Sequence, residues 1–493
     1  MGKLARNHGA LLAILFLGTF LRFYQLGTES LWRDEGWTTW FASLGSPSEI
    51  VEQSKTDNNF PTYYLILRYW IGLFGDSEFS VRFSSALAGV LAVFAIYKVG
   101  QLLFGRSTGL IASLLLTLAP FHIAYSQEAR VYSFMTLLAV LSFYFFLEIL
   151  AKPNPAPRTG YVLSTTALLY CHVYGLFIVL AQNIYYLTTA FLGKASGSRD
   201  GTRPGLGGWV LLQALLLVLY VPAFILLAGW ISSPTGRGWI TPPSLSSAYF
   251  DFIAYSGSRW LLILLLIFSL LAVVGLLKSG AGSKLYLLLL WLLTPVALPI
   301  AISVFSTPIF FRRYAIVATP ALYLLAAKGV EVASDAFSRA AFLTKIPQAL
   351  KANAIRLIVA TALVVLSSGV LWNYFERVNK AQWREAAQYM DARLLTNDLV
   401  LVYPEKALPV LVHYSDRTDV RKEPLPPDGD ASTAQSIKEH ERFWVVYDQT
   451  TPAAYDKRFP RTLLIESHNP IFSEQRYAGI TLTLYEKKYT QDY

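Results

Sequence analysis

The chain has 493 residues, of which 54% are hydrophobic and only 15% charged. Soluble domains carry about a quarter charged residues, so this composition excludes an ordinary soluble enzyme and favours a protein embedded in a membrane. The net charge of +10 is not gathered into a basic stripe with interleaved aromatic residues, which argues against nucleic acid as a partner, and the single cysteine, Cys171, excludes an internal disulfide.

Long apolar stretches recur along most of the chain. A helix that crosses a bilayer needs about 20 mostly apolar residues, and the sequence offers about eleven candidates. They are Ala10–Leu26, Phe79–Phe104, Thr108–Phe121, Val131–Leu150, Tyr161–His172, Tyr174–Phe191, Trp209–Leu227, Trp260–Leu277, Leu285–Phe305, Tyr314–Ala327 and Ile355–Leu371. The first stretch lacks an A-x-A cleavage pattern, so we interpret it as an uncleaved span.

The loops between these stretches alternate in charge. One set is basic, with Lys3 and Arg6, Arg106, Lys278 and Lys284, and Lys328 and Lys351. The opposite set mixes acidic, basic and aromatic residues, at 28–78, 122–130, 229–259 and 306–313. By the positive-inside rule the basic set is cytoplasmic. An odd number of spans then predicts a multi-pass plasma (inner) membrane protein with a cytoplasmic N-terminus and an extracytoplasmic C-terminal domain.

Two segments of the first outer loop are apolar but too short to span. In DEGWTTWFASLG, residues Trp37, Trp40, Phe41 and Leu44 follow the spacing i, i+3, i+4, i+7 of one helical face. FPTYYLILRYWIGLFG opens with Pro61, which is favourable in the first helical turn. Both segments are predicted to be helices that lie in the membrane interface.

The composition changes after Trp372. The short runs DLVLVYP, RFWVVYD, TLLIES and ITLTLYEKK are rich in β-forming residues, and helical stretches such as Trp383–Leu395 alternate with them. The sequence therefore predicts a polytopic α-helical transmembrane domain at residues 1–375 and a small α/β soluble domain at 376–493.

Asp34 and Glu35 are adjacent acids at the start of the first interfacial helix. A carboxylate at this place could deprotonate an incoming nucleophile or bind a divalent metal. The alternative is structural: Asp34 would be the helix N-cap, and Glu35 would interact favourably with the helix dipole. One position can serve both roles.

Further charged residues gather in other outer loops. Glu128 and Arg130 lie in FHIAYSQEARVY, and Arg312 with Arg313 follow FSTPIFF. Arginine can bind phosphate bidentately, so Arg130 and the pair Arg312–Arg313 could hold an anionic lipid phosphate. Glu128 could face the same outer cavity as Asp34 and act as a metal ligand or positioning group. The alternatives are an interfacial Glu–Arg pair and arginines that extend to the headgroups.

Three more residues of the outer loops are candidates. Lys55 lies in the polar part of the first outer loop and could line a cavity, and Tyr63 suits either sugar stacking or an interfacial aromatic belt. His172, in an outer turn, could bind a metal, although a lone histidine is more often a polar filler. No phosphate-binding P-loop or G-x-G-x-x-G motif is present, so no nucleotide cofactor is expected.

Several of these motifs together resemble the GT-C membrane glycosyltransferases, in particular the bacterial branch similar to protein O-mannosyltransferases and the lipid A aminoarabinose transferase. They are LWRDEGWTTWFA, NNFPTYYLILRYW, GLIASLLLTLAPFHIAYSQEARVYSFM and FRRYAIVATPALYLL. The resemblance is strong over roughly the first 150 residues and slight in the C-terminal tail. Asn58, Asn59 and Phe60 stand where relatives often have His or Lys.

The resemblance implies a function. Such enzymes transfer a sugar from a polyprenyl-phosphate donor to a lipid, glycan or protein acceptor on the outer face of the membrane, with inversion. It implies that Asp34 is catalytic, with Glu35 beside it, and that Glu128 is the second-loop acid. Arg130, or Arg312 with Arg313, would bind the lipid phosphate. A divalent cation, Mg²⁺ or Mn²⁺, could be bound by Asp34 and Glu128.

The alternative function is a transporter or flippase that moves a lipid-linked sugar without forming bonds. A flippase should place ionisable residues within the membrane along its pathway. Here the predicted spans carry little charge, and the acids gather in outer loops, so the sequence favours chemistry at one face of the membrane.

Overall fold

A computed structural model describes residues 2–151, 155–195, 205–232, 240–339, 347–450, 457–471 and 475–488. The chain divides into two units. The first unit comprises Met1–Tyr24, Ser54–Tyr63 and Arg82–Tyr374, and the second comprises Gln25–Gln53, Tyr64–Val81 and Phe375–Tyr493. Segments of the first outer loop therefore belong to the same unit as the C-terminal residues. The predicted boundary between 375 and 376 stays a prediction.

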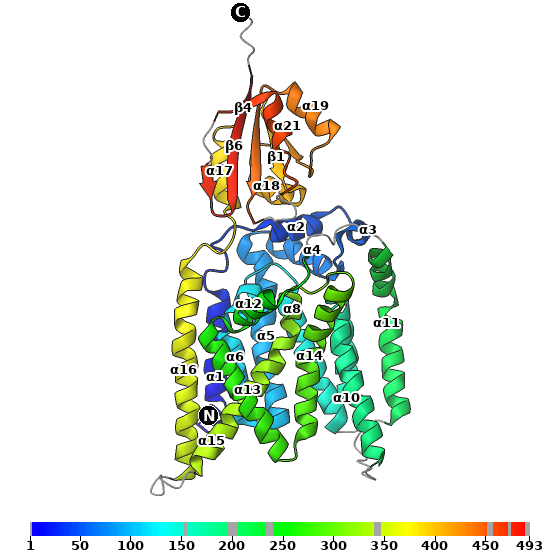
Figure 1. Ribbon diagram of the computed structural model, residues 1–493, viewed down its shortest axis with the longest axis vertical. Coiled ribbons are helices and arrows are strands. Elements are labelled where there is room, and N and C mark those ends of the chain that lie inside the picture. Colours follow the sequence, from blue (N-terminus) through cyan, green and yellow to red (C-terminus); the bar gives the residue numbers. More distant parts are fainter. Residues whose placement is uncertain are drawn as a thin grey trace, which may run out of the picture. The chain divides into compact units, whose positions relative to one another are not determined.

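Long helices make up the first unit (Figure 1). They are α1 (Gly2–Phe23), α5 (Glu78–Phe104), α6 (Arg106–Leu118), α7 (Pro120–Ser126), α8 (Tyr132–Ala151), α9 (Pro155–Cys171), α10 (Gly175–Ala195), α11 (Leu206–Ser232), α12 (Leu245–Ser256), α13 (Arg259–Lys278), α14 (Gly282–Phe305), the 3₁₀ helix η1 (Tyr314–Ala318), α15 (Thr319–Ser338) and α16 (Gln348–Glu376). Helix α15 packs against α6, α13 and α14, and most of its residues are buried.

Every one of the eleven predicted stretches overlaps a helix, but the count of eleven spans is not confirmed. In the described part of the chain, eight helices are long and apolar enough to cross a membrane, or nine if the pair α6–α7, which is bent by 63°, is one span. The other two stretches lie on α1, whose apolar part is only Gly9–Phe23, and on α9, which has 17 residues. These helices are those of a multi-pass membrane protein.

The break between α6 and α7 is held by a buried arginine. Pro120 begins α7 and cannot donate a backbone hydrogen bond, so carbonyl groups at the end of α6 lose their helical partners. The guanidinium of Arg22 in α1, which is fully buried, donates to the carbonyl oxygen of Leu116 at 3.0 Å and to that of Thr117 at 3.5 Å. These contacts supply hydrogen-bond donors to carbonyl groups that the break leaves without helical partners.

The second unit combines helices with a mixed sheet. Its elements from the first outer loop are α2 (Arg33–Ser43) and most of α3 (Pro47–Asp57) and α4 (Thr62–Phe74). The C-terminal elements are α17 (Trp383–Asp391), β1 (Leu399–Tyr403), η3 (Glu405–Ala407), α18 (Leu408–Tyr414), β2 (Arg421–Pro424), α19 (Ala431–Glu439), β3 (Arg442–Asp448), α21 (Arg461–Glu466), β4 (His468–Pro470), β5 (Gln475–Tyr477) and β6 (Ile480–Lys487).

The strand order is β2-β1-β3-β6-β4, with β5 also paired to β6. Strands β1, β2 and β3 are parallel, and β6 is antiparallel to β3. The predicted small α/β region is thus confirmed as a fold. One predicted strand is wrong: the residues of TLLIES lie mainly in the helix α21, because a three-residue apolar run has no periodicity that separates strand from helix.

The predicted helices of the first outer loop are present as α2 and α4, but the buried face of α2 is broader than predicted. Phe41 is fully buried, whereas Trp37 and Trp40 are only partly buried. Gly36 is buried as well, because α2 packs on α18: a Cβ atom at Gly36 would lie 2.3 Å from Cβ of Val410. Only glycine permits this approach between the first outer loop and a C-terminal helix.

Candidate functional site

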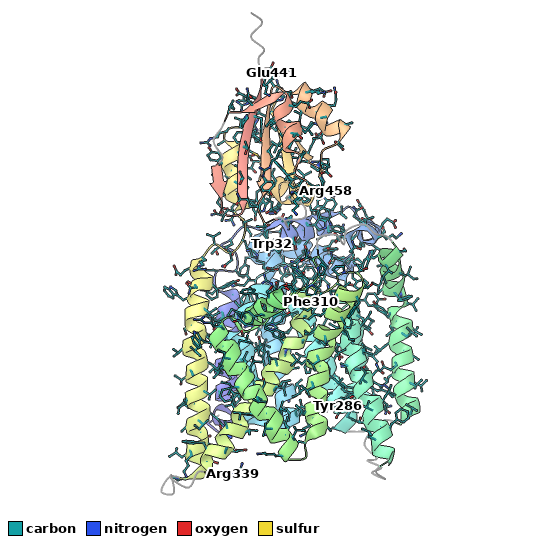
Figure 2. All side chains as sticks on the ribbon, viewed as in Figure 1. Trp32, Tyr286, Phe310, Arg339, Glu441 and Arg458 are labelled. Atoms are coloured by element: carbon teal, nitrogen blue, oxygen red, sulfur yellow. The ribbon has the colours of Figure 1, made fainter. Side chains whose placement is uncertain are left out.

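The first turn of α2 begins at Trp32 (labelled in Figure 2), which has an extended backbone and occupies the N-cap position. The backbone N–H of Trp32 donates to Oε2 of Glu35 at 3.3 Å, so Glu35 supplies one half of a capping box. Asp34 is the second helical residue. The structural alternative in which Asp34 is the N-cap is therefore wrong.

Glu35 is fully buried, and its Oε2 atom forms an ion pair with Nζ of Lys380 at 3.0 Å. Lys380 belongs to the segment that enters the C-terminal elements. Burial removes both charges from water, which costs desolvation free energy. The close contact offsets this cost only while both partners are present. The carboxylate of Glu35 thus fastens α2 to the C-terminal part of the second unit.

Arg33 lies between two carboxylates. Its Nη1 is 3.0 Å from Oδ2 of Asp448, and its Nε is 3.7 Å from Oδ1 of Asp34. Asp448 ends β3 and is fully buried, and its Oδ1 accepts hydrogen bonds from the backbone N–H and the hydroxyl of Thr450. Burial raises the pKa of Asp448, and the charge of Arg33 opposes that rise.

The three acids around the start of α2 differ in access to solvent. The side chain of Asp34 is 19% exposed, whereas those of Glu35 and Asp448 are 0% exposed. Asp34 is accordingly the one among these three that a substrate can reach. Arg33, Lys380 and Asp448 were not singled out in the sequence; the position of Asp448 at the carboxyl end of a parallel strand is the signal that could have found it.

In the first unit, a chain of hydrogen bonds positions the segment after α7. The backbone N–H of Arg130 donates to the carbonyl of Glu128 at 2.8 Å. The hydroxyl of Ser85 donates to the carbonyl of Arg130 at 3.0 Å and is itself 3.1 Å from the hydroxyl of Tyr63. Tyr63 is buried and supports this segment, and its contact with a sugar stays a prediction.

Arg130 and Arg313 share an aromatic neighbour. Their guanidinium carbons lie 5.9 Å and 5.4 Å from the ring centroid of Tyr132, which is buried at the start of α8. Arg313 is also 5.0 Å from the ring of Phe311 and 5.8 Å from that of Tyr314. Cations over aromatic faces are attracted by the ring quadrupole. We call Arg130, Arg313, Tyr132 and Tyr314 the arginine–tyrosine cluster.

Arg312 lies elsewhere. This exposed residue follows the segment that contains Phe310 (labelled in Figure 2), and its carbonyl accepts the hydroxyl of Tyr255 at 2.9 Å. Burial raises the pKa of Asp251 in α12, and the positive charge of Arg312 opposes that rise, which places the two charges near each other. Arg313 thus belongs to the cluster, and that Arg312 binds the lipid phosphate together with Arg313 stays a prediction.

The remaining candidates lie outside the cluster. Lys55 is exposed on the last turn of α3. Glu128 is partly buried beside Arg130 in the sequence and belongs to the first unit, whereas Asp34 belongs to the second. Among the described residues, no three His, Cys, Asp or Glu side chains gather closely enough to hold a metal ion. The metal pair of Asp34 with Glu128 stays a prediction.

Comparison with known proteins places these features in context. Residues 58–220 match the protein family described as dolichyl-phosphate-mannose-protein mannosyltransferase. No curated protein matches the chain significantly.

Solved structures are similar over nearly the whole chain. ArnT from Cupriavidus metallidurans in the apo state has a TM-score of 0.60 at 15% identity, covering 97% of this chain and 98% of that one. The same protein bound to undecaprenyl phosphate gives 0.56 at 14% identity with the same coverage. The archaeal oligosaccharyltransferase AglB from Archaeoglobus fulgidus, in complex with an inhibitory peptide and a dolichol-phosphate, gives 0.56 at 11% identity, covering 98% of this chain and 74% of that one. The chain is thus a multi-pass membrane protein with the GT-C fold.

Proposed function

We propose that this chain is a glycosyltransferase that moves a sugar from a polyprenyl-phosphate donor to a lipid, glycan or protein acceptor on the extracytoplasmic face of the plasma membrane. The observation that carries the proposal is the arginine–tyrosine cluster, found in a chain that shares its fold with an ArnT structure bound to undecaprenyl phosphate. The proposed orientation has the N-terminus in the cytoplasm and residues 376–493 outside.

The cluster suits a lipid phosphate. The planar guanidinium groups of Arg130 and Arg313 can each present two parallel N–H donors to phosphate oxygens. The tyrosine rings beside them lower the local dielectric, so each charge–charge interaction is stronger than in water. Negative charge grows on the phosphate as the sugar leaves, and cations that are already in place stabilise that charge most in the transition state.

Asp34 is the proposed general base. Its carboxylate would take the proton of the acceptor hydroxyl while the acceptor oxygen bonds to the anomeric carbon. The bond from that carbon to the phosphate oxygen breaks with its electron pair on the oxygen, so polyprenyl phosphate leaves and the anomeric configuration inverts. Glu35 then serves α2 rather than the chemistry, through its contacts with Trp32 and Lys380.

A divalent cation, Mg²⁺ or Mn²⁺, fits this proposal as a further aid. Carboxylate oxygens of Asp34 and Glu128 are the ligand type that hard cations prefer. When bound, the cation would supply positive charge to the phosphate. One similar solved structure is the oligosaccharyltransferase from Archaeoglobus fulgidus in complex with Zn and sulfate.

The test is the variant Asp34→Asn in membrane preparations supplied with a radiolabelled polyprenyl-phosphate sugar. Loss of a general base is expected to lower kcat by about 10²- to 10⁴-fold. The matched control is Asp76→Asn, which alters an exposed acid of the same outer loop and should leave transfer unchanged. Full activity of a correctly inserted Asp34→Asn protein would refute the assignment. Translocation of the lipid without a new glycosidic bond would instead identify a flippase.

A further inference from the structure

His172 lies in the turn between α9 and α10, close to the arginine–tyrosine cluster. Its Nδ1 atom accepts the backbone N–H of Tyr174 at 3.2 Å. A backbone N–H can only donate, so Nδ1 carries no proton, and the neutral imidazole must bear its proton on Nε2. The backbone of the turn thus sets the tautomer.

The surroundings of the ring keep it neutral. Burial, followed by the positive charges of Arg313 and Arg130, lowers the pKa of His172 to about 3. The ring centroid lies 4.5 Å from that of Tyr314, whose ring is 5.8 Å from the guanidinium carbon of Arg313. Tyr174 and Tyr314 are the other titratable groups in contact with it.

The Nε2–H group is a donor without an acceptor in the described part of the chain. The hydrogen bond to Tyr174 involves the other ring nitrogen. Arg130 and Arg313, whose charges act on the His172 ring, are donors as well. All three donor groups lie around the rings of Tyr132 and Tyr314, and donors gathered in this way favour an anion with several oxygen atoms.

We propose that the Nε2–H of His172 donates a hydrogen bond to a phosphate oxygen of the polyprenyl-phosphate group, beside Arg130 and Arg313. This assignment rests on the proposed function. The polyprenyl-phosphate sugar is a phosphodiester with two non-bridging oxygens, whereas the departing lipid phosphate has three. A third hydrogen-bond donor is therefore most useful as the sugar leaves. The neutral imidazole of His172 can donate a hydrogen bond to the oxygen that is freed from the sugar. It does so without adding a third positive charge to a half-buried site.

Two variants distinguish a hydrogen bond from His172 to phosphate from a purely structural role, in which the side chain of His172 only caps the turn. In His172→Asn, the side-chain oxygen can still accept the N–H of Tyr174, but no donor reaches the former position of Nε2. In His172→Gln, the longer amide can place an N–H there. The measurement is inhibition of sugar transfer by added polyprenyl phosphate, with kcat and the donor KM determined separately and thermal unfolding recorded for each variant.

We expect His172→Asn to weaken inhibition by polyprenyl phosphate, and to lower kcat, about ten- to a hundredfold, because a hydrogen bond to a charged group is lost. Thermal unfolding should stay close to that of the wild type, and His172→Gln should recover part of both losses. His413→Asn, which alters a partly buried histidine of the second unit, is the control and should change neither.

The outcomes also separate this inference from the proposed function. If Arg313→Gln weakens inhibition while folded His172→Asn behaves like the wild type, the role of His172 is refuted and the phosphate site stands. If His172→Asn keeps activity and inhibition while His172→Gln loses activity and unfolds earlier, His172 only caps the turn, and the inference fails. If the wild type shows neither transfer nor inhibition, both proposals fall.

Discussion

Arg312 and Arg313 are neighbours in the sequence but lie in different surroundings. The guanidinium of Arg313 is close to three aromatic rings, whereas Arg312 is exposed beside Asp251. Planar stacking is a property of arginine that lysine lacks. The two residues therefore offer a matched pair for testing whether the cluster, rather than positive charge alone, binds the donor.

We expect Arg313→Lys to raise the donor KM about tenfold or more, because the lysine keeps the charge but loses both the stacking and the bidentate geometry. Arg312→Lys should have a clearly smaller effect. Steady-state kinetics with a polyprenyl-phosphate sugar would measure both. No effect of either substitution would show that positive charge alone, and not the cluster, determines binding, and equal losses would show that the cluster is not special to Arg313.

Two contacts hold helix α2 against the C-terminal elements: the buried ion pair of Glu35 with Lys380, and the close approach of Gly36 to Val410 of α18. Lys380→Met leaves the carboxylate of Glu35 buried without this partner, and breaking a buried pair in this way costs about 3–5 kcal/mol. We expect a marked fall in the unfolding temperature of the purified protein. The double variant Glu35→Gln with Lys380→Met, which removes both charges, should be more stable than Lys380→Met alone; the reverse order would contradict the pairing.

The approach of α2 to α18 is tested by adding a single methyl group. Gly36→Ala would place Cβ within 2.3 Å of Val410, which is too close for two carbon atoms, so the helices must separate. Overpacking of this kind costs about 1–3 kcal/mol. Gly72→Ala in α4 is the control, since nothing lies within 4 Å of a Cβ atom there. Thermal unfolding of both variants is the measurement, and equal stability would refute the tight contact.

The orientation of the whole molecule can be tested because the chain has a single cysteine. In a Cys171→Ser background, a cysteine at the exposed Ser432 of α19 should react with a membrane-impermeant thiol reagent in intact cells. A cysteine at Ser279, between α13 and α14, should react only after the membrane is opened, because the positive-inside rule places this loop in the cytoplasm. The opposite pattern of labelling would invert the proposed topology.

Helices and strands could be predicted from the sequence because they depend on local composition. Contacts between residues far apart in the chain could not. Apolar stretches predicted helices because a bilayer requires them, and the β-forming residues of RFWVVYD predicted β3. Capping of α2 was missed because the backbone of Trp32, not the side chain of Asp34, fills the N-cap position. The pairs of Arg33 with Asp448 and Glu35 with Lys380 join residues 415 and 345 positions apart, and no local pattern reveals them.

The long separation between Glu35 and Lys380 has a consequence for biogenesis. Ribosomes add about 5–20 residues per second, so roughly 20–70 s pass between the synthesis of the two residues. During that interval α2 has left the ribosome without the partner that neutralises its buried acid, while the intervening helices enter the bilayer. The start of α2, with Asp34, can mature only after translation has passed Lys380. We therefore expect a nascent chain that is stalled before Lys380 to be inserted without the ion pair that holds the start of α2.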